Sequence, residues 1–461
     1  MVIVRHFGRK DAPQSAMGAP MNDRLGVVRT LLETAPDSAV RDLDMALRAD
    51  TSAALAPVRA MVRAELSDRG VRDVVLAPVA PLCAPRADGF KQALFPAGAL
   101  SRVWRTLRAL EPTAVTVVVS NLTLTTDDEG YPPACDDLCR AAAVAIRDGD
   151  PAIEGLARYL EDFQPGAAAQ FAGYLELAPL ARTAIKRLPI WLRNMTDEHA
   201  AAVRLLFKDA DAIAPDASPR LLEMLLAQTA EPWRLLRIIS AVTHRAGDRY
   251  LSSSELAEFC ERILADIERR VNLVRQFDVD GGIEAGQAAA AAVAVAISEI
   301  LEFEESLDLN KSGPWGQRIG KLRQSLSGLT EGLLKKTPRI VGDALPLQQV
   351  RVGGVNLRME PRLDQPPDAR LVRRALASLA FFDRCRATSG QGGYGTVRNR
   401  AGEEISQRLD SYIEDILAMA HGGELESPDH ARAFLEVAAD MTALAQDEKS
   451  AQIVRRRAAA A

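Results

Sequence analysis

A glycine-rich run is the closest approach to a catalytic or nucleotide-binding motif in this chain of 461 residues. As a bare pattern, Gly390-Gln-Gly-Gly-Tyr-Gly395 fits both the dinucleotide fingerprint and the glycine loop of protein kinases. A dinucleotide loop follows a buried strand, whereas the apolar residues before Gly390 recur with a helical period. A kinase loop needs a lysine on the next strand, and no lysine occurs between Gly395 and Lys449. The run therefore predicts a loop between helices rather than a phosphate cradle.

Residues that could hold a metal are present, but they do not form a complete ligand set. Cys135 and Cys139 are one helical turn apart in the acidic segment 127–139. No second cysteine pair or nearby histidine supplies the remaining ligands of a tetrahedral zinc site. The run Asp278-Val-Asp-Gly-Gly282 resembles the opening of a calcium loop, but Ala289 stands where the bidentate acid is due. We predict structural cysteines, an ordinary loop and no metal.

The motifs of the familiar hydrolases and nucleotide-binding enzymes are missing from the sequence. It contains no G-x-S-x-G and no H-E-x-x-H, and the Gly320-Lys321 pair is followed by Leu322 rather than serine or threonine. We therefore assign no catalytic residue and no cofactor, and we expect a protein that is not an enzyme. A site assembled from residues distant in sequence stays open as an alternative.

Positive charge is concentrated in the segment from Lys311 to Arg351, where eight basic residues face only Glu331 and Asp343. Leucines at helical spacing give the same segment an apolar stripe. A partner-binding role is predicted for Trp315, Arg318, Lys321, Arg323, Lys335, Lys336 and Arg339. Other proteins are the expected partners, while nucleic acid and an anionic membrane surface are less favoured. The alternative is a core-packed helix whose charges are merely solvated.

Helical periodicity dominates the elements that must position these residues. Its clearest example follows the capping sequence Ser252-Ser-Ser-Glu255. The apolar stripe of this helix consists of Leu256, Phe259, Ile263, Leu264, Ile267, Val271, Val274 and Phe277. Glu258 with Arg262, and Asp266 with Arg270, are spaced as ion pairs one turn apart, and we expect both pairs on the solvent side.

Two segments depart from this pattern. Residues 114–126 are rich in β-branched side chains and can form either a strand or a helix that starts near Pro112. Residues 350–359 alternate apolar and polar on both sides of Gly353-Gly354, which predicts a β-hairpin with one apolar face.

The composition is that of an ordinary folded protein, with 48% hydrophobic residues, few aromatics and a net charge of −5. It excludes a mainly disordered chain and argues against broad nucleic-acid binding. We predict an all-α fold, an irregular multi-helix bundle or α-solenoid with one short hairpin near residues 350–359. The expected organisation is a flexible tail (1–20), an N-terminal mainly helical unit (21–130), a central helical body (131–310), a basic helix with linker and hairpin (311–367) and a C-terminal helical unit (368–461). Met21 is an alternative start.

Five cysteines and a short apolar N-terminus predict a cytoplasmic protein without an export signal. The most apolar segment, 285–298, is too short to cross a bilayer, so we expect no transmembrane helix. The abundance of alanine and arginine suggests a bacterial source. Together these features predict a non-enzymatic scaffold, adaptor or regulatory protein that binds other proteins. The alternative is a helical small-molecule-binding protein or enzyme with a pocket between helices.

Overall fold

The structure is a computed structural model that describes residues 21–49, 52–86, 89–124, 133–243, 256–352 and 356–460. Over these ranges it is all-α apart from one two-stranded antiparallel hairpin, which confirms the predicted fold class. The chain divides into two compact units. Unit 1 extends to Leu188 and includes Lys208–Gln228, and unit 2 comprises Pro189–Phe207 and Thr229–Ala461. The predicted tail, residues 1–20, lies outside the described residues.

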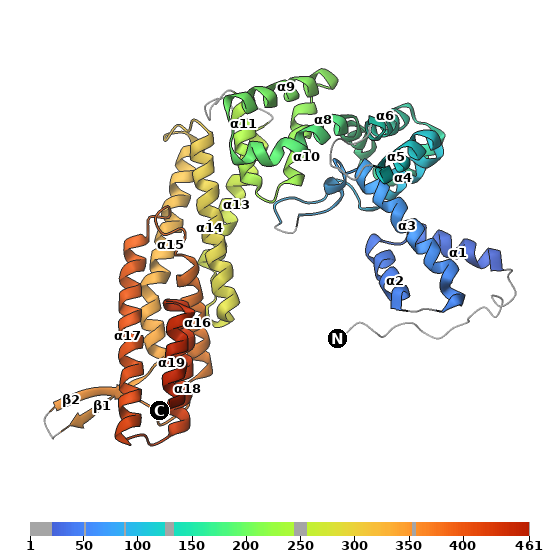
Figure 1. Ribbon diagram of the computed structural model, residues 1–461. Coiled ribbons are helices and arrows are strands. Elements are labelled where there is room, and N and C mark those ends of the chain that lie inside the picture. The colour runs from blue at the N-terminus through green and yellow to red at the C-terminus, as the bar shows by residue number, and fades with distance from the viewer. Residues whose placement is uncertain are drawn as a thin grey trace. The chain divides into compact units, whose positions relative to one another are not determined.

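Unit 1 includes α3 and five helices that contact it, α1, α2, α4, α5 and α6 (Figure 1). Its helices are α1 (Met21–Thr34), α2 (Asp37–Ala49), α3 (Ala56–Val75), α4 (Gly98–Leu110), α5 (Pro112–Leu124), α6 (Pro133–Asp148), α7 (Glu154–Phe163), most of α8 (Ala167–Arg193), the end of α9 (Asp197–Ile213) and α10 (Ala217–Gln228). Pro151 begins a short 3-10 turn before α7, and Asp150 caps this turn by accepting a hydrogen bond from the Ala152 amide (2.8 Å).

Two buried arginines of α3 hold the α1–α2 connection. Arg72 binds the carboxylate of Asp37 at 2.7 Å, and Arg69 binds the same carboxylate. Arg69 also donates to the carbonyls of Leu32 (2.7 Å) and Ala35 (2.9 Å), at the C-terminal end of α1. Although burial acts in the opposite direction, the hydrogen bonds from the two arginines hold the pKa of Asp37 below its ordinary value. This cluster fixes both helix ends to α3.

A third buried arginine joins α3, α6 and α8. The guanidinium of Arg182 donates to the carbonyls of Val74 (2.9 Å) and Val75 (2.7 Å), which end α3. It also pairs with Asp136 at 2.8 Å and lies beside Cys139. Carbonyls at a helix C-terminus have no partner within the helix, so a buried cation is well placed there.

The segment that could have been strand or helix is a helix. Residues 112–124 form α5, and Val115 and Val118, three residues apart, are buried while Val117 and Val119 are exposed. This three-residue spacing fits a helix that contacts α4 and α6 on one side, so the strand alternative is wrong over these residues. Tertiary packing has overridden the β-propensity of valine.

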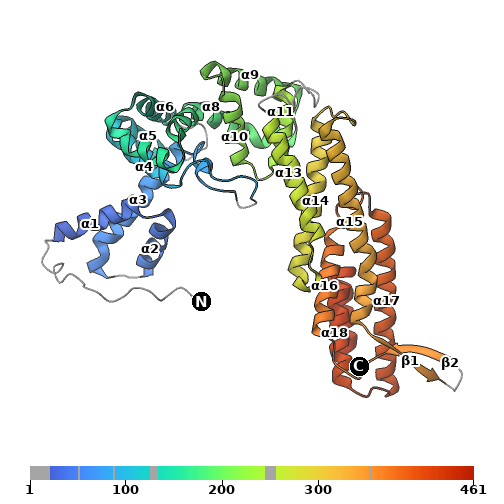
Figure 2. The same cartoon turned by 180° about the vertical axis from the view of Figure 1, so that it is seen from behind.

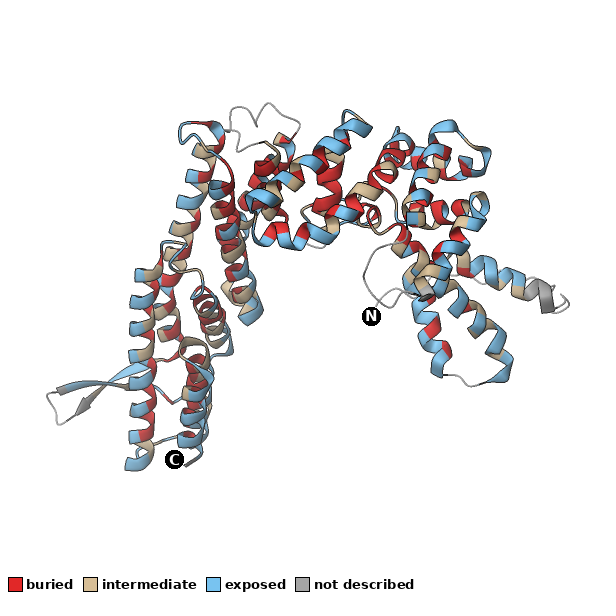
Figure 3. Cartoon of the chain, turned by 45° about the horizontal axis from the view of Figure 1, so that its top comes forward, coloured by how far each residue is buried: buried red, intermediate tan, exposed pale blue. Residues whose placement is uncertain are grey.

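Long helices make up most of unit 2. Its elements are the end of α8, the start of α9, α11 (Leu236–Val242), α13 (Ala257–Arg275), α14 (Gly282–Ser306), α15 (Pro314–Ala344), β1 (Leu347–Val352), β2 (Asn356–Pro361), α16 (Ala369–Arg384), α17 (Gly395–Gly422), α18 (Pro428–Ala445) and α19 (Glu448–Ala460). Helices α13 to α17 lie lengthwise beside one another in both views (Figures 1 and 2). Their buried residues lie on the faces that they turn toward one another (Figure 3).

The predicted stripe of α13 forms part of this core. All of its members from Leu256 to Val274 are buried, although the predicted capping sequence 252–255 lies outside the described residues. Both predicted ion pairs form, Glu258 with Arg262 and Asp266 with Arg270. The expected solvent position of Asp266 is wrong, because this residue is 4% exposed and faces α14.

Helix α14 packs very closely against α16. A Cβ added at Gly286 would overlap the main-chain carbonyl of Ala377, so only glycine permits this approach. The alanine-rich composition of α14 therefore reflects a short interhelical distance. Residues Val279–Ser306 are the one stretch among the described residues that is long and apolar enough to cross a bilayer, and 61% of its most apolar window is buried inside the protein.

The predicted hairpin is present, but its single apolar face is not. The register pairs Val350 with Arg358 and Gln349 with Met359, and paired residues share a face of the ladder. Val350 therefore lies on the face opposite to Met359 and Leu347. A shift of one residue in the pairing of the two strands moves every side chain of a strand to the opposite face. The position of Gly353-Gly354 in the sequence does not by itself determine this pairing.

Candidate functional site

The predicted partner-binding residues all lie on α15, and three of them contact acids of neighbouring helices. Trp315 is 4% exposed, and its indole nitrogen donates to Glu261 of α13 at 2.6 Å. Arg318 pairs with Glu261 and Glu268 at 2.6 Å each. Arg323 pairs with Glu304 of α14. These three side chains fasten α15 to α13 and α14.

The other four predicted residues, Lys321, Lys335, Lys336 and Arg339, are exposed. Lys335, Lys336 and Arg339 follow Lys321 by 14, 15 and 18 residues, so the four side chains fall within an arc of about 100° on one side of α15. Lys335 forms an exposed ion pair with Glu331 at 2.9 Å. Within the described part of the chain, Lys321, Lys336 and Arg339 form no salt bridge. We call these four residues the basic face of α15.

Three glycines lie on or next to this side of α15. Gly328 and Gly332, four residues apart, lie on the side of the basic face, and Gly320 lies about 80° further round the helix from Gly328. A Cβ added at any of them would meet no atom within 4 Å. Glycine inside a helix costs about 1 kcal/mol relative to alanine. No contact within the described structure requires these glycines, and their absence of side chains exposes the α15 backbone.

A cleft of about 490 Å³ borders the basic face. Its lining brings together residues of α14, α15 and the glycine loop that precedes α17. They are Ile297, Ile300, Leu301, Gly320, Arg323, Gln324, Leu326, Ser327, Gly328, Glu331, Gln391, Gly392, Gly393 and Tyr394. The basic segment and the glycine loop, two separate features of the sequence, thus meet at one site.

The glycine loop is shaped by packing rather than by an anion. The amide of Gly392 donates to the carbonyl of Thr388 (2.8 Å), and the amide of Gly393 donates to that of Gly390 (3.3 Å). Tyr394 is buried, with its hydroxyl 2.6 Å from the Thr388 hydroxyl, and a Cβ at Gly392 would overlap its ring. Because these two amides are bonded inside the loop, they do not converge on an external phosphate.

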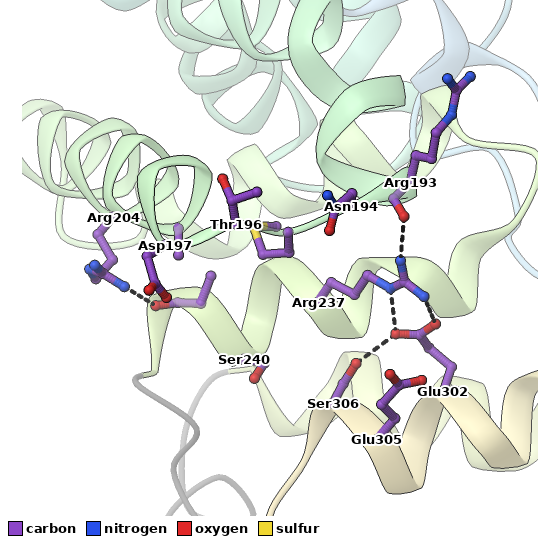
Figure 4. A pocket seen from close by; sticks show the side chains of 13 residues that line it. Arg193, Asn194, Thr196, Asp197, Arg204, Arg237, Ser240, Glu302, Glu305 and Ser306 are labelled. Carbon is purple, nitrogen blue, oxygen red and sulfur yellow. Dashed lines mark hydrogen bonds and ion pairs between the residues drawn. The ribbon is translucent and has the colours of Figure 1, made fainter.

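A second cavity of unit 2, also about 490 Å³, is polar (Figure 4). It lies where the end of α8, the start of α9, α11 and the end of α14 meet. Glu302 accepts two hydrogen bonds from Arg237 (2.7 and 2.8 Å) and one from Ser306 (2.6 Å). Arg237 also donates to the carbonyls of Leu192 and Arg193 at 3.0 Å, and the Glu302 hydrogen bonds raise its pKa. This network fastens the helices at one side of the cavity.

Three further charged residues line the same cavity. Asp197, Arg204 and Glu305 form no ion pair with any described residue, although Arg204 donates to the carbonyl of Ala241 (3.4 Å). The guanidinium of Arg193 points away from the cavity (Figure 4). One positive and two negative groups suit a small polar ligand that carries both charges. The sequence analysis missed this site, because Arg237 and Glu302 are 65 residues apart. Glu302 and Ser306 on the buried side of an apolar helix were the available signal.

The cysteines of the acidic segment are structural. Cys135 and Cys139 are fully buried in α6, and Cys139 donates to the carbonyl of Val75 at 3.5 Å. Burial raises the pKa of Cys139 to about 12. Residues 127–129 of the acidic segment lie outside the described residues. Among the residues that the structure describes, no three histidine, cysteine or acidic side chains are grouped as metal ligands.

The remaining charged motifs have partners within unit 2. Asp280, from the sequence that resembles a calcium loop, pairs with Arg370 (3.2 Å) and Arg374 (3.8 Å) of α16. In the terminal arginine run, Arg455 pairs with acids of α18 and α19, and Arg457 with an acid of α17. These charges contribute to helix packing at the surface.

The sequence matches no model of a protein family, and neither curated proteins nor solved structures show significant similarity to it.

Proposed function

We propose that this protein is a non-enzymatic helical interaction protein that binds an acidic helical segment of another protein on the basic face of α15. The observation that carries the proposal is the juxtaposition of four exposed basic side chains, three glycines with open space beside them and an adjoining apolar cleft. A scaffold, adaptor or regulatory role follows from this mode of binding.

The shape and chemistry of the surface favour a helix as the bound element. A partner backbone can approach α15 closely at Gly320, Gly328 and Gly332, where no side chain intervenes. Apolar residues of an amphipathic helix would enter the cleft beside Ile300 and Leu301. Acidic residues of that helix would pair with the basic face, whose Lys335–Glu331 pair is exposed and therefore weak.

Two other macromolecules are weaker candidates for this surface. Nucleic acid needs a broad positive surface, whereas the chain carries a net charge of −5 and two acids, Glu331 and Asp343, interrupt the basic face. An anionic membrane would need exposed apolar side chains beside the bases, whereas the apolar residues here line a cleft and Gly328 and Gly332 lie between the bases. A cytoplasmic protein partner is the proposal that these features support.

The experiment compares two quadruple variants with equal changes in net charge. The first neutralises the basic face by Lys321→Gln, Lys335→Gln, Lys336→Gln and Arg339→Gln. The control neutralises four exposed arginines elsewhere in unit 2, by Arg373→Gln, Arg384→Gln, Arg400→Gln and Arg456→Gln. A photo-crosslinking residue at the exposed position Gln324 identifies the bound protein in cell extract.

We expect a stoichiometric crosslinked partner with the control, and at least a tenfold weaker interaction with the basic-face variant. The interaction should also weaken as salt rises. A partner that binds both variants equally, or no crosslink at Gln324, would contradict the proposal.

The polar cavity of Figure 4 favours a second candidate function, that of a helical small-molecule-binding protein or enzyme. The unpaired charges of Asp197, Arg204 and Glu305 are the specific observation in support. A thermal-shift screen with nucleotides, divalent metals and common metabolites tests it, since a ligand at 100 times its Kd adds about 2.7 kcal/mol. A shift that disappears in both Arg204→Gln and Glu305→Gln would place the ligand in this cavity, and a flat screen would count against it.

A further inference from the structure

The polar cavity of Figure 4 carries unpaired charges at both of its ends. Asp197 and Arg204 lie on the same side of α9, because they are seven residues apart, which is almost two helical turns. Glu305, near the end of α14, lies at the other end of the cavity (Figure 4). A ligand that contacts the charges at both ends is therefore elongated.

The balance of charge in the cavity is negative. Arg237 is neutralised by its two hydrogen bonds to the carboxylate of Glu302. The side chains of Asp197 and Glu305 form no hydrogen bond or ion pair with any described residue, so two negative charges stand against the single guanidinium of Arg204. A ligand with two cationic groups and one anionic group would balance these three charges.

The two charges on α9 lie next to each other without forming an ion pair. The one hydrogen bond of the Arg204 side chain is long, at 3.4 Å to the carbonyl of Ala241. A guanidinium has five N–H donors, so most of those of Arg204 remain available to an anion. A carboxylate and an ammonium on the same carbon atom would find their partners here in Arg204 and Asp197.

A nearly buried hydroxyl is an independent sign of a polar ligand. Ser240 of α11 lines the cavity and is 8% exposed, and its hydroxyl forms no hydrogen bond with any described residue. Buried polar groups in native proteins are nearly always bonded. Met195, Ala200 and Ala241 add apolar patches to the same wall, and such patches suit a chain of methylene groups.

We propose that this cavity binds a free α-amino acid with a cationic side chain. Its ammonium pairs with Asp197 and its carboxylate with Arg204, while the cationic end of its side chain crosses the cavity to Glu305. This inference rests on the second candidate function, that of a small-molecule-binding protein, and it gives that function a ligand class. It does not involve the basic face of α15.

Free L-arginine is the probe, because two molecules of similar shape each lack one of its charges. Citrulline has a neutral ureido group in place of the guanidinium, and agmatine lacks the carboxylate. Calorimetry of the full chain at constant ionic strength should show saturable binding of one arginine per chain. Both analogues should bind at least about fivefold more weakly, a moderate factor because Asp197 and Glu305 are exposed.

Two substitutions assign the contacts to the two ends of the cavity. Glu305→Gln should weaken arginine binding about fivefold and remove the preference for arginine over citrulline. Arg204→Gln should weaken it about as much and remove the preference for arginine over agmatine. The matched controls are Glu284→Gln, at an exposed acid near the start of α14, and Arg384→Gln, at an exposed arginine of α16. Neither control should change the affinity.

Three results would overturn the proposal: no saturable binding of arginine up to about 10 mM, equal binding of arginine and citrulline, or equal effects of the two substitutions and their controls. If another metabolite stabilises the protein through Arg204 and Glu305 while arginine does not, the cavity is a binding site and only the ligand class is wrong. A flat thermal-shift screen that includes arginine would contradict both the ligand class and the second candidate function.

Discussion

Glu299 of α14 and Asp266 of α13 share the guanidinium of Arg270 in the core of unit 2. Arg270 lies 2.8 Å from the Asp266 carboxylate and 3.2 Å from Glu299, which is completely buried. Burial, together with the hydrogen bond and negative charge of Asp266, raises the pKa of Glu299 from 4.5 to about 9. Glu299 is therefore protonated in the folded protein at neutral pH.

This buried acid predicts that the protein loses stability as pH rises. The folded chain holds the Glu299 proton more tightly than the unfolded chain, so its contribution is fully present below pH 4.5. That contribution is lost as pH rises toward 9, by up to about 1.4 kcal/mol per pH unit. Urea unfolding of wild type and Glu299→Gln between pH 5.5 and 8.5 measures the effect. In Glu299→Gln the unfolding free energy should depend less steeply on pH than in wild type, and the variant should be the more stable of the two at pH 8.5.

An exposed glutamate of the same helix provides the control for that experiment. Glu305→Gln removes a carboxylate without a salt bridge and should leave the slope unchanged. Parallel slopes for wild type and Glu299→Gln would show that Glu299 is ionised in the folded state.

The close approach of α14 and α16 predicts that Gly286 tolerates no side chain. Gly286→Val should destabilise the protein by about 3 kcal/mol, because the added atoms overlap the Ala377 carbonyl and the helices must separate. Gly328→Ala on the open side of α15 is the matched control and should stabilise by up to about 1 kcal/mol. Thermal unfolding of both variants measures the difference. Equal effects would contradict the packing described at Gly286.

Arg182 of α8, whose guanidinium binds the last carbonyls of α3, predicts a large loss of stability on replacement. Arg182→Met leaves Asp136 and two main-chain carbonyls without their partner, and we expect a loss of about 3 kcal/mol in unfolding free energy. The exposed pair of Arg140 with Asp137 supplies the comparison, since Arg140→Gln should change stability by less than about 0.5 kcal/mol. Denaturant titration of the two variants would refute the assignment if their losses were similar.

All five cysteines should be unreactive in the folded protein. Each is a free, buried thiol, and burial raises the pKa of Cys83, Cys139, Cys260 and Cys385 to about 12. Burial also raises the pKa of Cys135. At pH 8 the reactive thiolate is therefore scarce as well as inaccessible. Titration with an aromatic disulfide reagent should detect no fast-reacting thiol in buffer and five in strong denaturant.

The spacing of apolar residues was sufficient to predict the fold class, because in an amphipathic helix the apolar residues that recur at each turn are those on the buried side. The stripe from Phe259 to Val274 is buried as predicted. The strand or helix choice for residues 114–124 depended on neighbours in space, which a local pattern does not contain. The hairpin was correctly located, but its faces were not, because pairing Val350 with Arg358 depends on register.

The sites were less accessible to sequence reasoning than the fold. The pattern located the basic helix, but it could not show that Trp315 and Arg318 contact Glu261, more than 50 residues earlier. Nor could it show that Gly392 and Gly320 line the same cleft, since the intervening chain forms the hairpin and α16. Unbonded groups such as the Ser240 hydroxyl become visible only after every neighbour has been positioned.

The chain passes between the two units three times, after Leu188, after Phe207 and after Gln228. A truncation after Leu188 or after Phe207 therefore leaves one of the two units incomplete. Only a truncation after Gln228 gives a fragment that contains all of unit 1 and lacks the main part of unit 2. Even that fragment would carry the stranded segment 189–207, whose packing partners in unit 2 are gone. Deletion mapping from either terminus would thus confuse loss of a contact with loss of folding, and point substitutions are the sounder route to dissecting this molecule.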